Sequence, residues 1–259
     1  DSPVLALSTR RINSGYTGAL IRLRRSTDNT EQDFGSGLGM GETVDYSAID
    51  TFLSGSTAFV VKWYDQSGQG RDLQQQVASR QPTFDAGATT GRAVKFSGAS
   101  DCHLSSVSQV SGGFFSSGPA VSIHHATDNN DNGFCTNMSL STAPHSNGNI
   151  TYFRTNRYSN VNRFVWRGVQ FAPTGSTSTS GNEYNYYHHD GSNLRVDLNG
   201  SEIGSIGNTT TANSGADSFN LGADATAHEW DGYTYELIIF DSSQSTANSD
   251  AIRDDMNSQ

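Results

Sequence analysis

The chain has little of several residue types that usually reveal function. Only two of its 259 residues are cysteines, Cys102 and Cys135, and the sequence does not show whether they pair. It contains no Cys-x-x-Cys motif, no P-loop and no internal repeat. No run of 18 apolar residues occurs, so we expect no membrane-spanning helix. Only Lys62 and Lys95 are lysines, and the net charge of −10 argues against nucleic acid and anionic membranes as partners.

Apolar residues are also scarce, at 34% of the chain, whereas glycine, serine, threonine and asparagine are abundant. Disorder does not explain this composition, because aromatic residues make up 10% and short apolar runs recur throughout. Many short strands separated by turn residues predict an all-β fold, a two-sheet jelly-roll sandwich. We expect a single domain over 1–259.

Two short helices are predicted within this β-rich chain. Apolar residues at helical spacing predict a helix over 46–53, with Asp45 as N-cap and Gly55 at its end. A short amphipathic helix is expected at the C-terminus, over 246–257. Its inward-facing residues are predicted to be Ala247, Ile252 and Met256.

The most informative stretch is a strand and turn in the first third of the chain. An apolar, β-branched run at 59–61 predicts a buried strand, and the Ser-Gly-Gln-Gly turn that follows ends it. Tyr64, Asp65 and Gln66 lie between the two. Flat rings, carboxylates and amides line sugar-binding sites, so these three residues are candidate glycan contacts.

Two segments of the first third resemble a known family. The stretch WYDQSGQGRDLQQ (63–75), preceded by LSTRRINSGYTGALIRLRRSTDN (7–29), is similar to the opening of the catalytic domain of α-L-arabinofuranosidase B, glycoside hydrolase family 54. It also resembles concanavalin A-like domains of bacteriophage structural proteins. Further on, AVKFSGASDCHL (93–104) and DGSNLRVDLNGSEIG (190–204) resemble laminin G-like sandwiches. The resemblance therefore implies a concanavalin A-like jelly roll.

For an enzyme of this family, the resemblance implies two catalytic carboxylates. The family's acid lies in a Gly-Gly-Asp-Asn step, which Asp224 matches within Leu-Gly-Ala-Asp-Ala. The nucleophile lies in a Glu-Asn-Gly/Asn-Leu-Phe step, and its nearest match is Asp131 in Asp-Asn-Gly-Phe. Such a pair would serve a retaining glycosidase. The family's vicinal cysteines are absent here, and the alternative is that both aspartates only stabilise turns.

The same mid-chain segment resembles the first half of a calcium loop. Asp128, Asn130 and Asn132 have the D-x-N-x-N-G spacing of oxygen ligands for Ca²⁺. The bidentate glutamate of that motif is missing, because residue 139 is serine. An ordinary hairpin rich in Asp and Asn is the alternative, so no cofactor and no metal site is otherwise predicted.

The degraded carboxylate pair and the polar, acidic composition favour a non-catalytic surface module. We therefore expect a glycan-binding or structural decoration domain of a phage or other virion particle, extracellular or on the virion surface. The alternatives are a secreted α-L-arabinofuranosidase-type hydrolase and a purely architectural module. Its partners would be a neutral glycan or other structural protein subunits, with no nucleic acid and no membrane, and oligomers are possible.

If the module binds a glycan, the sequence suggests where. The expected pocket lies where the turn after Tyr64 meets the hairpin of Asp224, with Asp65, Gln66 and the ring of Trp230 completing it. Both segments carry motifs that resemble the family. Two carboxylates and a ring would suit stacking and hydroxyl recognition of a neutral sugar.

Overall fold

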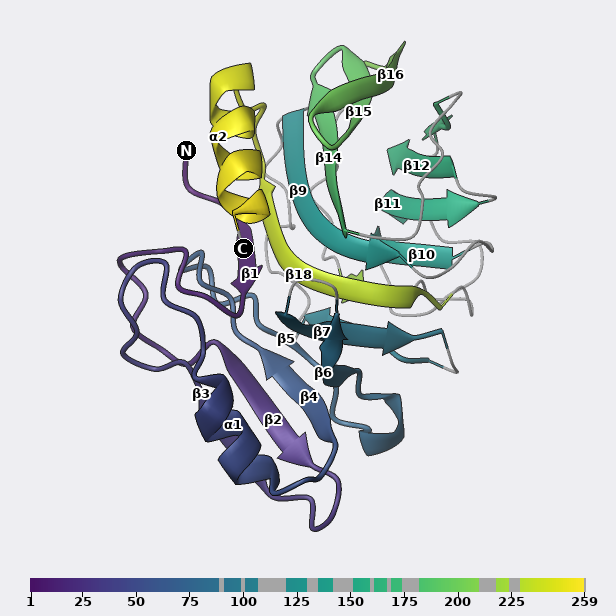
Figure 1. Ribbon diagram of the computed structural model, residues 1–259. Coiled ribbons are helices and arrows are strands. Elements are labelled where there is room, and N and C mark those ends of the chain that lie inside the picture. The colour runs from purple at the N-terminus through teal and green to yellow at the C-terminus, as the bar shows by residue number, and fades with distance from the viewer. Residues whose placement is uncertain are drawn as a thin grey trace.

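The computed structural model describes the backbone of residues 1–88, 91–98, 101–106, 120–129, 135–141, 151–158, 161–166, 169–173, 182–209, 218–223 and 229–258. Its strands are connected by an unbroken series of antiparallel pairings, and its two α-helices are short (Figure 1). Neither of these helices is long and apolar enough to cross a membrane. The predicted all-β, concanavalin A-like two-sheet jelly roll with a short C-terminal helix is confirmed.

One layer, here called the β9 sheet, is built on the two longest strands. In spatial order it contains β16 (Ser201–Gly207), β15 (Asn193–Leu198), β14 (Asn182–Asp190), β9 (Ala120–Asn129) and β18 (Asp231–Phe240), with β1 (Leu5–Ser8) and β7 (Gly91–Ser97) on the far edge of β18. In Figure 1, β9 and β18 run side by side and bend together.

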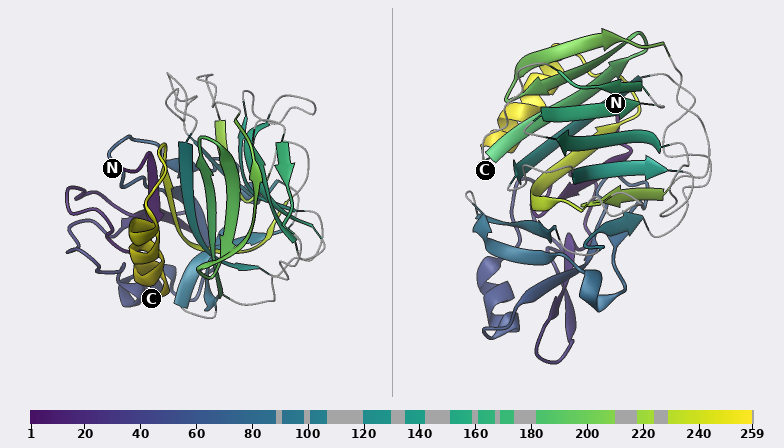
Figure 2. Two further views of the ribbon diagram at one scale, coloured as in Figure 1. Left: turned by 90° about the horizontal axis from the view of Figure 1, so that it is seen from above. Right: turned by 90° about the vertical axis from the view of Figure 1, so that its right-hand side faces the viewer.

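The second layer is here called the β10 sheet. In spatial order it contains β13 (Val169–Phe171), β12 (Val161–Trp166), β11 (Thr151–Tyr158), β10 (Cys135–Ser141), β17 (Ser218–Leu221), β8 (Leu104–Ser106), β5 (Leu73–Gln74), β4 (Ala58–Trp63), β2 (Ile21–Arg25) and β3 (Glu31–Phe34). β6 (Thr83–Ala88) forms a hairpin with β7 and also pairs with β4, which links the two layers. Figure 2 shows the long strands in one half of the molecule and β2–β4 in the other.

The hydrophobic core lies between the two layers. Ile123 and Leu237 of the β9 sheet share one buried cluster with Met138 and Leu221 of the β10 sheet. Trp63 is fully buried in the same cluster, as expected for the end of a core strand. The burial of such large apolar groups is the main stabilising contribution to a fold of this kind.

Both helices have the predicted bounds because their ends are encoded locally. In α1 (Tyr46–Leu53), the Asp45 carboxylate accepts from the N–H groups of Ser47 and Ala48, and Gly55 follows in the left-handed region at φ 81°. In α2 (Thr246–Asn257), the Ser245 hydroxyl accepts from the N–H of Asn248.

The inward face of α2 differs in one position from the prediction. Met256 is buried and Ile252 partly buried, but Ala247 is exposed and Ser249 is buried in its place. The phenol of Tyr184 donates to the backbone carbonyl of Ser249 at 3.5 Å, which holds this turn of the helix against β14.

Candidate functional site

The ends of four strands meet at one corner of the sandwich. They are the end of β9, the start of β10, the end of β17 and the start of β18. Met138 of β10 pairs with Leu221 of β17, and Asn129 of β9 pairs with Gly232 of β18. We call this region the catalytic corner, because the two candidate carboxylates of the sequence are attached to it.

Gly222 joins the strands of the catalytic corner. Its N–H donates to the carbonyl oxygen of Asn137 at 2.7 Å, and its own carbonyl accepts from the N–H of Trp230 at 2.8 Å. Its φ of 97° lies in the region that favours glycine. A Cβ atom at this position would lie 2.1 Å from Cδ1 of Phe96, so the close packing also requires glycine.

Asp131 and Asp224 themselves lie outside the described residues, but their attachment points are defined. Asp131 is two residues beyond Asn129, and Asp224 is two residues beyond Gly222. Asn129 pairs with Gly232 of β18, and the N–H of Trp230 donates to the carbonyl of Gly222, so the two attachment points are connected through the start of β18.

Buried polar side chains extend from the catalytic corner along the inner face of the β9 sheet. His125 Nε2 lies 3.1 Å from the hydroxyl of Thr234, and the amide of Asn185 donates to the hydroxyl of Thr127 at 3.3 Å. All four are at most 1% exposed. Burial lowers the pKa of His125 to about 3, so its imidazole is neutral at neutral pH.

The sequence had not singled out this polar layer as a site. One signal for it is the alternation in β9, where Val121, Ile123, His125 and Thr127 fall on one face. The first two lie in the apolar core and the last two continue the same row with polar groups. A change from apolar to polar residues along one strand face indicates where the apolar core ends and a pocket begins.

Trp230 lies next to the catalytic corner, but its ring is fully buried, which does not favour the predicted glycan contact. The indole stacks on Phe96 with 5.6 Å between ring centroids, and it lies 6.0 Å from the ring of His125. Trp230 therefore supports the corner from within the core.

Asp65 is placed in the fold as a structural residue. Its carboxylate is buried and accepts from the N–H groups of Ala6, Ser67 and Arg71 at 2.9–3.0 Å, and from the Ser67 hydroxyl at 2.6 Å. All of these partners are groups of the chain itself, so this placement does not favour contact with a sugar.

Gln66 holds the N-terminal segment in the same way. Its amide oxygen accepts from the N–H of Ile12 at 3.0 Å, and its amide nitrogen donates to the carbonyls of Ser8 and Arg10. The side chain is completely buried. Together, Asp65 and Gln66 fix residues 6–12 against the turn after β4.

Tyr64 is partly exposed but contacts a different part of the molecule. Its phenol donates to Asp33 Oδ1 of β3 at 2.8 Å, and Lys62 lies over its ring at 5.2 Å. Tyr64 thus packs on β3, whereas Trp230 packs on β7. The described contacts do not gather Tyr64, Asp65, Gln66 and Trp230 into one pocket.

The predicted calcium site is only partly described. Asp128 is buried in β9, where it pairs with Asn182 and Tyr233, and Asn130 and Asn132 lie outside the described residues. In the part of the chain that the structure describes, no three His, Cys, Asp or Glu side chains form a metal-binding group. Cys102 carries a free, buried thiol. The calcium site, the single-domain boundary, the oligomeric state and the partners stay predictions.

Comparison with known protein families gives one match. The family described as "Alpha-L-arabinofuranosidase B, catalytic" matches residues 2–137, more than half of the chain. The chain belongs to this family. The matched segment includes β9 and the start of β10, and with them Asp131.

Similar sequences agree with this assignment, and similar solved structures share the fold. The alpha-L-arabinofuranosidase B of Aspergillus niger is 40% identical over 77 residues, which cover 29% of this chain and 15% of that protein. A solved arabinofuranosidase complexed with arabinofuranosyl-alpha-1,2-xylobiose has a TM-score of 0.74 at 17% identity, over 98% of this chain and 62% of that one. A mutant of a glycoside hydrolase family 54 arabinofuranosidase, soaked with 4-nitrophenyl a-l-arabinofuranoside, has a TM-score of 0.73 with the same coverage. The chain thus spans less than two thirds of these relatives.

These findings correct the function expected from the sequence. A non-catalytic phage or virion module was favoured because the motifs around Asp131 and Asp224 depart from the family pattern. The family match instead favours the alternative, an arabinofuranosidase catalytic domain. The mistake was to interpret local motif changes as loss of function, although the described strands beside both segments are paired within the sandwich.

Proposed function

We propose that this chain is the catalytic domain of an α-L-arabinofuranosidase, which hydrolyses terminal α-L-arabinofuranosyl bonds. The observation that carries the proposal is the hydrogen-bonded chain of Asn137, Gly222 and Trp230, since it ties the segments of Asp131 and Asp224 to one corner. Family membership adds the chemistry, because a glycoside hydrolase of this kind needs two carboxyl groups near one sugar.

In this proposal the two aspartates divide the chemistry of a retaining glycosidase. Asp131 attacks the anomeric carbon and forms a covalent arabinosyl ester, while Asp224 gives its proton to the departing oxygen. Asp224 then takes a proton from water, which attacks the ester and releases arabinose and the free Asp131 carboxylate. The carboxyl groups of such enzymes are about 5–5.5 Å apart.

The described part of the corner suits this chemistry. The neutral His125 and the hydroxyls of Thr127 and Thr234 offer hydrogen bonds without adding a charge. Burial raises the pKa of a carboxylic acid and keeps it able to donate a proton. We propose that this layer lies below the sugar and orients its hydroxyl groups.

The shorter side chain of Asp131 has a consequence for rate. Aspartate is one methylene shorter than the glutamate of the family pattern, so its carboxylate starts about 1 Å further back unless the backbone compensates. We expect Asp131→Glu to retain activity or to raise it, whereas Asp131→Asn removes the nucleophile. The mechanism itself requires no metal ion.

The proposed substrates follow from the relatives. Similar proteins were studied with 4-nitrophenyl a-l-arabinofuranoside and arabinofuranosyl-alpha-1,2-xylobiose. We therefore propose arabinose-substituted polysaccharides as the natural class. Because such polymers are too large to enter a cell, we also propose an extracellular site of action.

The test is the stereochemistry of the first product. The protein is mixed with 4-nitrophenyl α-L-arabinofuranoside and the first anomer released is followed by proton NMR. The proposal predicts release of arabinose with retained α configuration. Absence of turnover at high enzyme concentration, or release of the inverted anomer, contradicts it.

A further inference from the structure

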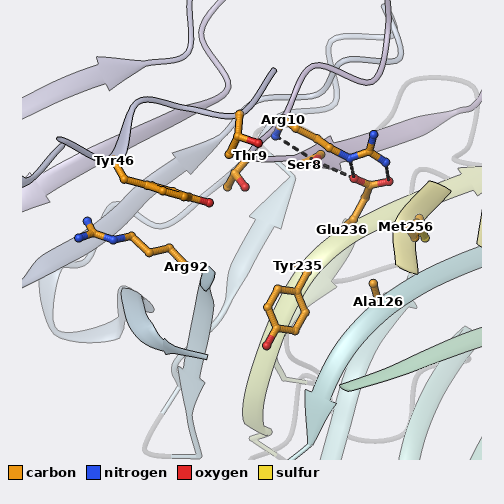
Figure 3. Close-up of a pocket in the computed structure, with 10 residues that line it drawn as sticks. Ser8, Thr9, Arg10, Tyr46, Arg92, Ala126, Tyr235, Glu236 and Met256 are labelled. Atoms are coloured by element: carbon orange, nitrogen blue, oxygen red, sulfur yellow. Dashed lines mark hydrogen bonds and ion pairs between the residues drawn. The ribbon is translucent and has the colours of Figure 1, made fainter. Parts of the chain in front are cut away.

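One cavity of the described structure has a volume of about 190 Å³ and opens where residues 8–10 and α1 approach β7 and β18 (Figure 3). We call it the seam pocket. The described residues that line it include none of the polar layer of His125, Thr127 and Thr234. Its volume corresponds to about six water molecules, which is the size of one sugar residue.

The cation on one side of the seam pocket is already paired with acidic side chains. Arg10 binds Glu236 in a bidentate pair, with Nε–Oε2 at 2.9 Å and Nη2–Oε1 at 3.0 Å, and Figure 3 shows this pair at one edge of the space. Ser8 donates a further 2.7 Å hydrogen bond to Glu236, and Arg10 also contacts Asp255. The guanidinium and the buried carboxylate are therefore occupied by each other.

The second cation of the seam pocket is paired as well. Arg92 Nη2 lies 2.5 Å from Asp50 Oδ1. With both guanidinium groups facing carboxylates, the pocket offers no uncompensated positive charge to an anionic ligand. The pairing of both guanidinium groups favours a neutral ligand over an anion.

Aromatic rings and hydroxyl groups complete the pocket. In Figure 3, the rings of Tyr46 from α1 and Tyr235 from β18 lie on two sides of the space. Arg92 lies over the Tyr46 ring at 5.4 Å and thereby holds it in place. Burial raises the pKa of Tyr46, so its phenol stays protonated as a hydrogen-bond donor. Rings beside hydroxyls such as that of Thr9 are the surfaces that recognise sugars.

We propose that the seam pocket is a second, non-catalytic binding site for a neutral sugar residue of a polymeric substrate. The choice of an arabinose-substituted polymer as its ligand rests on the proposed function. The shape of the seam pocket and the pairing of its two arginines do not depend on the proposed function. A chain held at two places binds more tightly than at either one alone, so the pocket raises affinity for polymers and not for small glycosides.

Two variants change the seam pocket in different ways. Tyr235→Ala removes one ring, and Ala126→Leu fills the cavity while keeping both rings. Tyr64→Ala is the control, since it removes a partly exposed strand tyrosine that packs on β3. Thermal unfolding of all three verifies that each variant is folded.

The measurements compare arabinose-substituted xylan with 4-nitrophenyl α-L-arabinofuranoside. Both pocket variants should raise KM for the polymer by about tenfold, with kcat/KM for the aryl glycoside unchanged. Tyr64→Ala should leave both values unchanged. An unaltered polymer KM in folded Tyr235→Ala and Ala126→Leu, or an equal loss in Tyr64→Ala, overturns the inference.

A binding measurement separates this inference from the proposed function. Affinity electrophoresis in gels that contain the polymer requires no turnover. Retardation of the wild-type protein that is lost in both pocket variants supports the seam pocket even if the aryl glycoside is not hydrolysed. Equal migration of wild type and pocket variants contradicts the pocket, whatever the activity.

Discussion

The N–H of Gly222 donates a 2.7 Å hydrogen bond to the carbonyl oxygen of Asn137, which joins β17 to β10 beside both candidate carboxylate segments. The carbonyl of Gly222 in turn accepts from Trp230, so one glycine connects three parts of the chain. Both hydrogen bonds require the backbone of residue 222 to lie against the Phe96 ring at positive φ. Only glycine, which has no Cβ atom, fits there.

Gly222→Ala should therefore destabilise the fold more than an ordinary glycine substitution. The added Cβ would collide with the Phe96 ring, and overpacking of this kind costs about 1–3 kcal/mol beyond the backbone strain. Gly68→Ala is the matched control, since Gly68 also has positive φ but has no atom within 4 Å of a new Cβ. Urea unfolding measures both, and equal losses of stability would show that the Phe96 contact is unimportant.

Asp65→Asn should cost stability and should not affect sugar recognition specifically. The amide cannot accept all the hydrogen bonds that reach the carboxylate from Ala6, Ser67 and Arg71, so we expect a loss of about 3 kcal/mol. Asp33→Asn, which breaks a half-exposed pair with Arg22, should cost less than about 1 kcal/mol. A variant at Asp65 with normal stability but weaker glycan binding would restore it as a sugar contact.

Acid should destabilise the protein through two buried histidines. Burial lowers the pKa of His124 and His125 to about 3 from an ordinary 6.5. Between these values the unfolded chain binds more protons than the folded one, so stability is full above pH 6.5 and falls as the pH drops. Each histidine should contribute about 1.4 kcal/mol per pH unit to this loss.

Replacement of one histidine should flatten this pH dependence. Urea unfolding of the wild type and of His125→Gln at about pH 7 and about pH 5 gives the slope for each protein. Because an unfolded histidine titrates near pH 6.5, the variant should lose about 2 kcal/mol less stability than the wild type between these two pH values. Identical slopes would mean that His125 becomes protonated without unfolding.

The elements predicted well from sequence are those encoded by near neighbours. Asp45, Gly55 and Ser245 define the ends of α1 and α2 within a few residues of the helices, so the bounds agree with the structure. The burial of Trp63 likewise follows from the apolar strand before it. Such signals require no knowledge of distant parts of the chain.

The residues whose roles the sequence did not define are those with distant partners. Asp65 and Gln66 have side chains suited to a sugar, but Asp65 also accepts from the N–H of Ala6 and Gln66 from the N–H of Ile12, both more than fifty residues earlier in the chain. Trp230 has the residue type of a stacking platform, yet it packs on Phe96 inside the core. Only long-range strand pairing decides between these roles, and sequence periodicity does not contain it.

The catalytic corner depends on both local and long-range signals. The resemblance identified Asp131 and Asp224 as candidates, but the pairing of β10 with β17 and of β9 with β18 is what attaches their segments to one place. The polar layer of His125 and Thr234 is visible in the sequence only as two polar residues in strand patterns. Its position beside the corner required the structure.

The most direct test of the central claim compares two leaving groups in Asp224→Asn. As general acid, Asp224 must protonate the sugar oxygen released from arabinofuranosyl-α-1,2-xylobiose, whereas 4-nitrophenolate leaves without a proton. The variant should lose about 10²–10⁴-fold in kcat/KM on the oligosaccharide and much less on the aryl glycoside, with Asp33→Asn unchanged on both. An equal loss on the two substrates, or full activity on the oligosaccharide, contradicts the assignment of Asp224 as the catalytic acid.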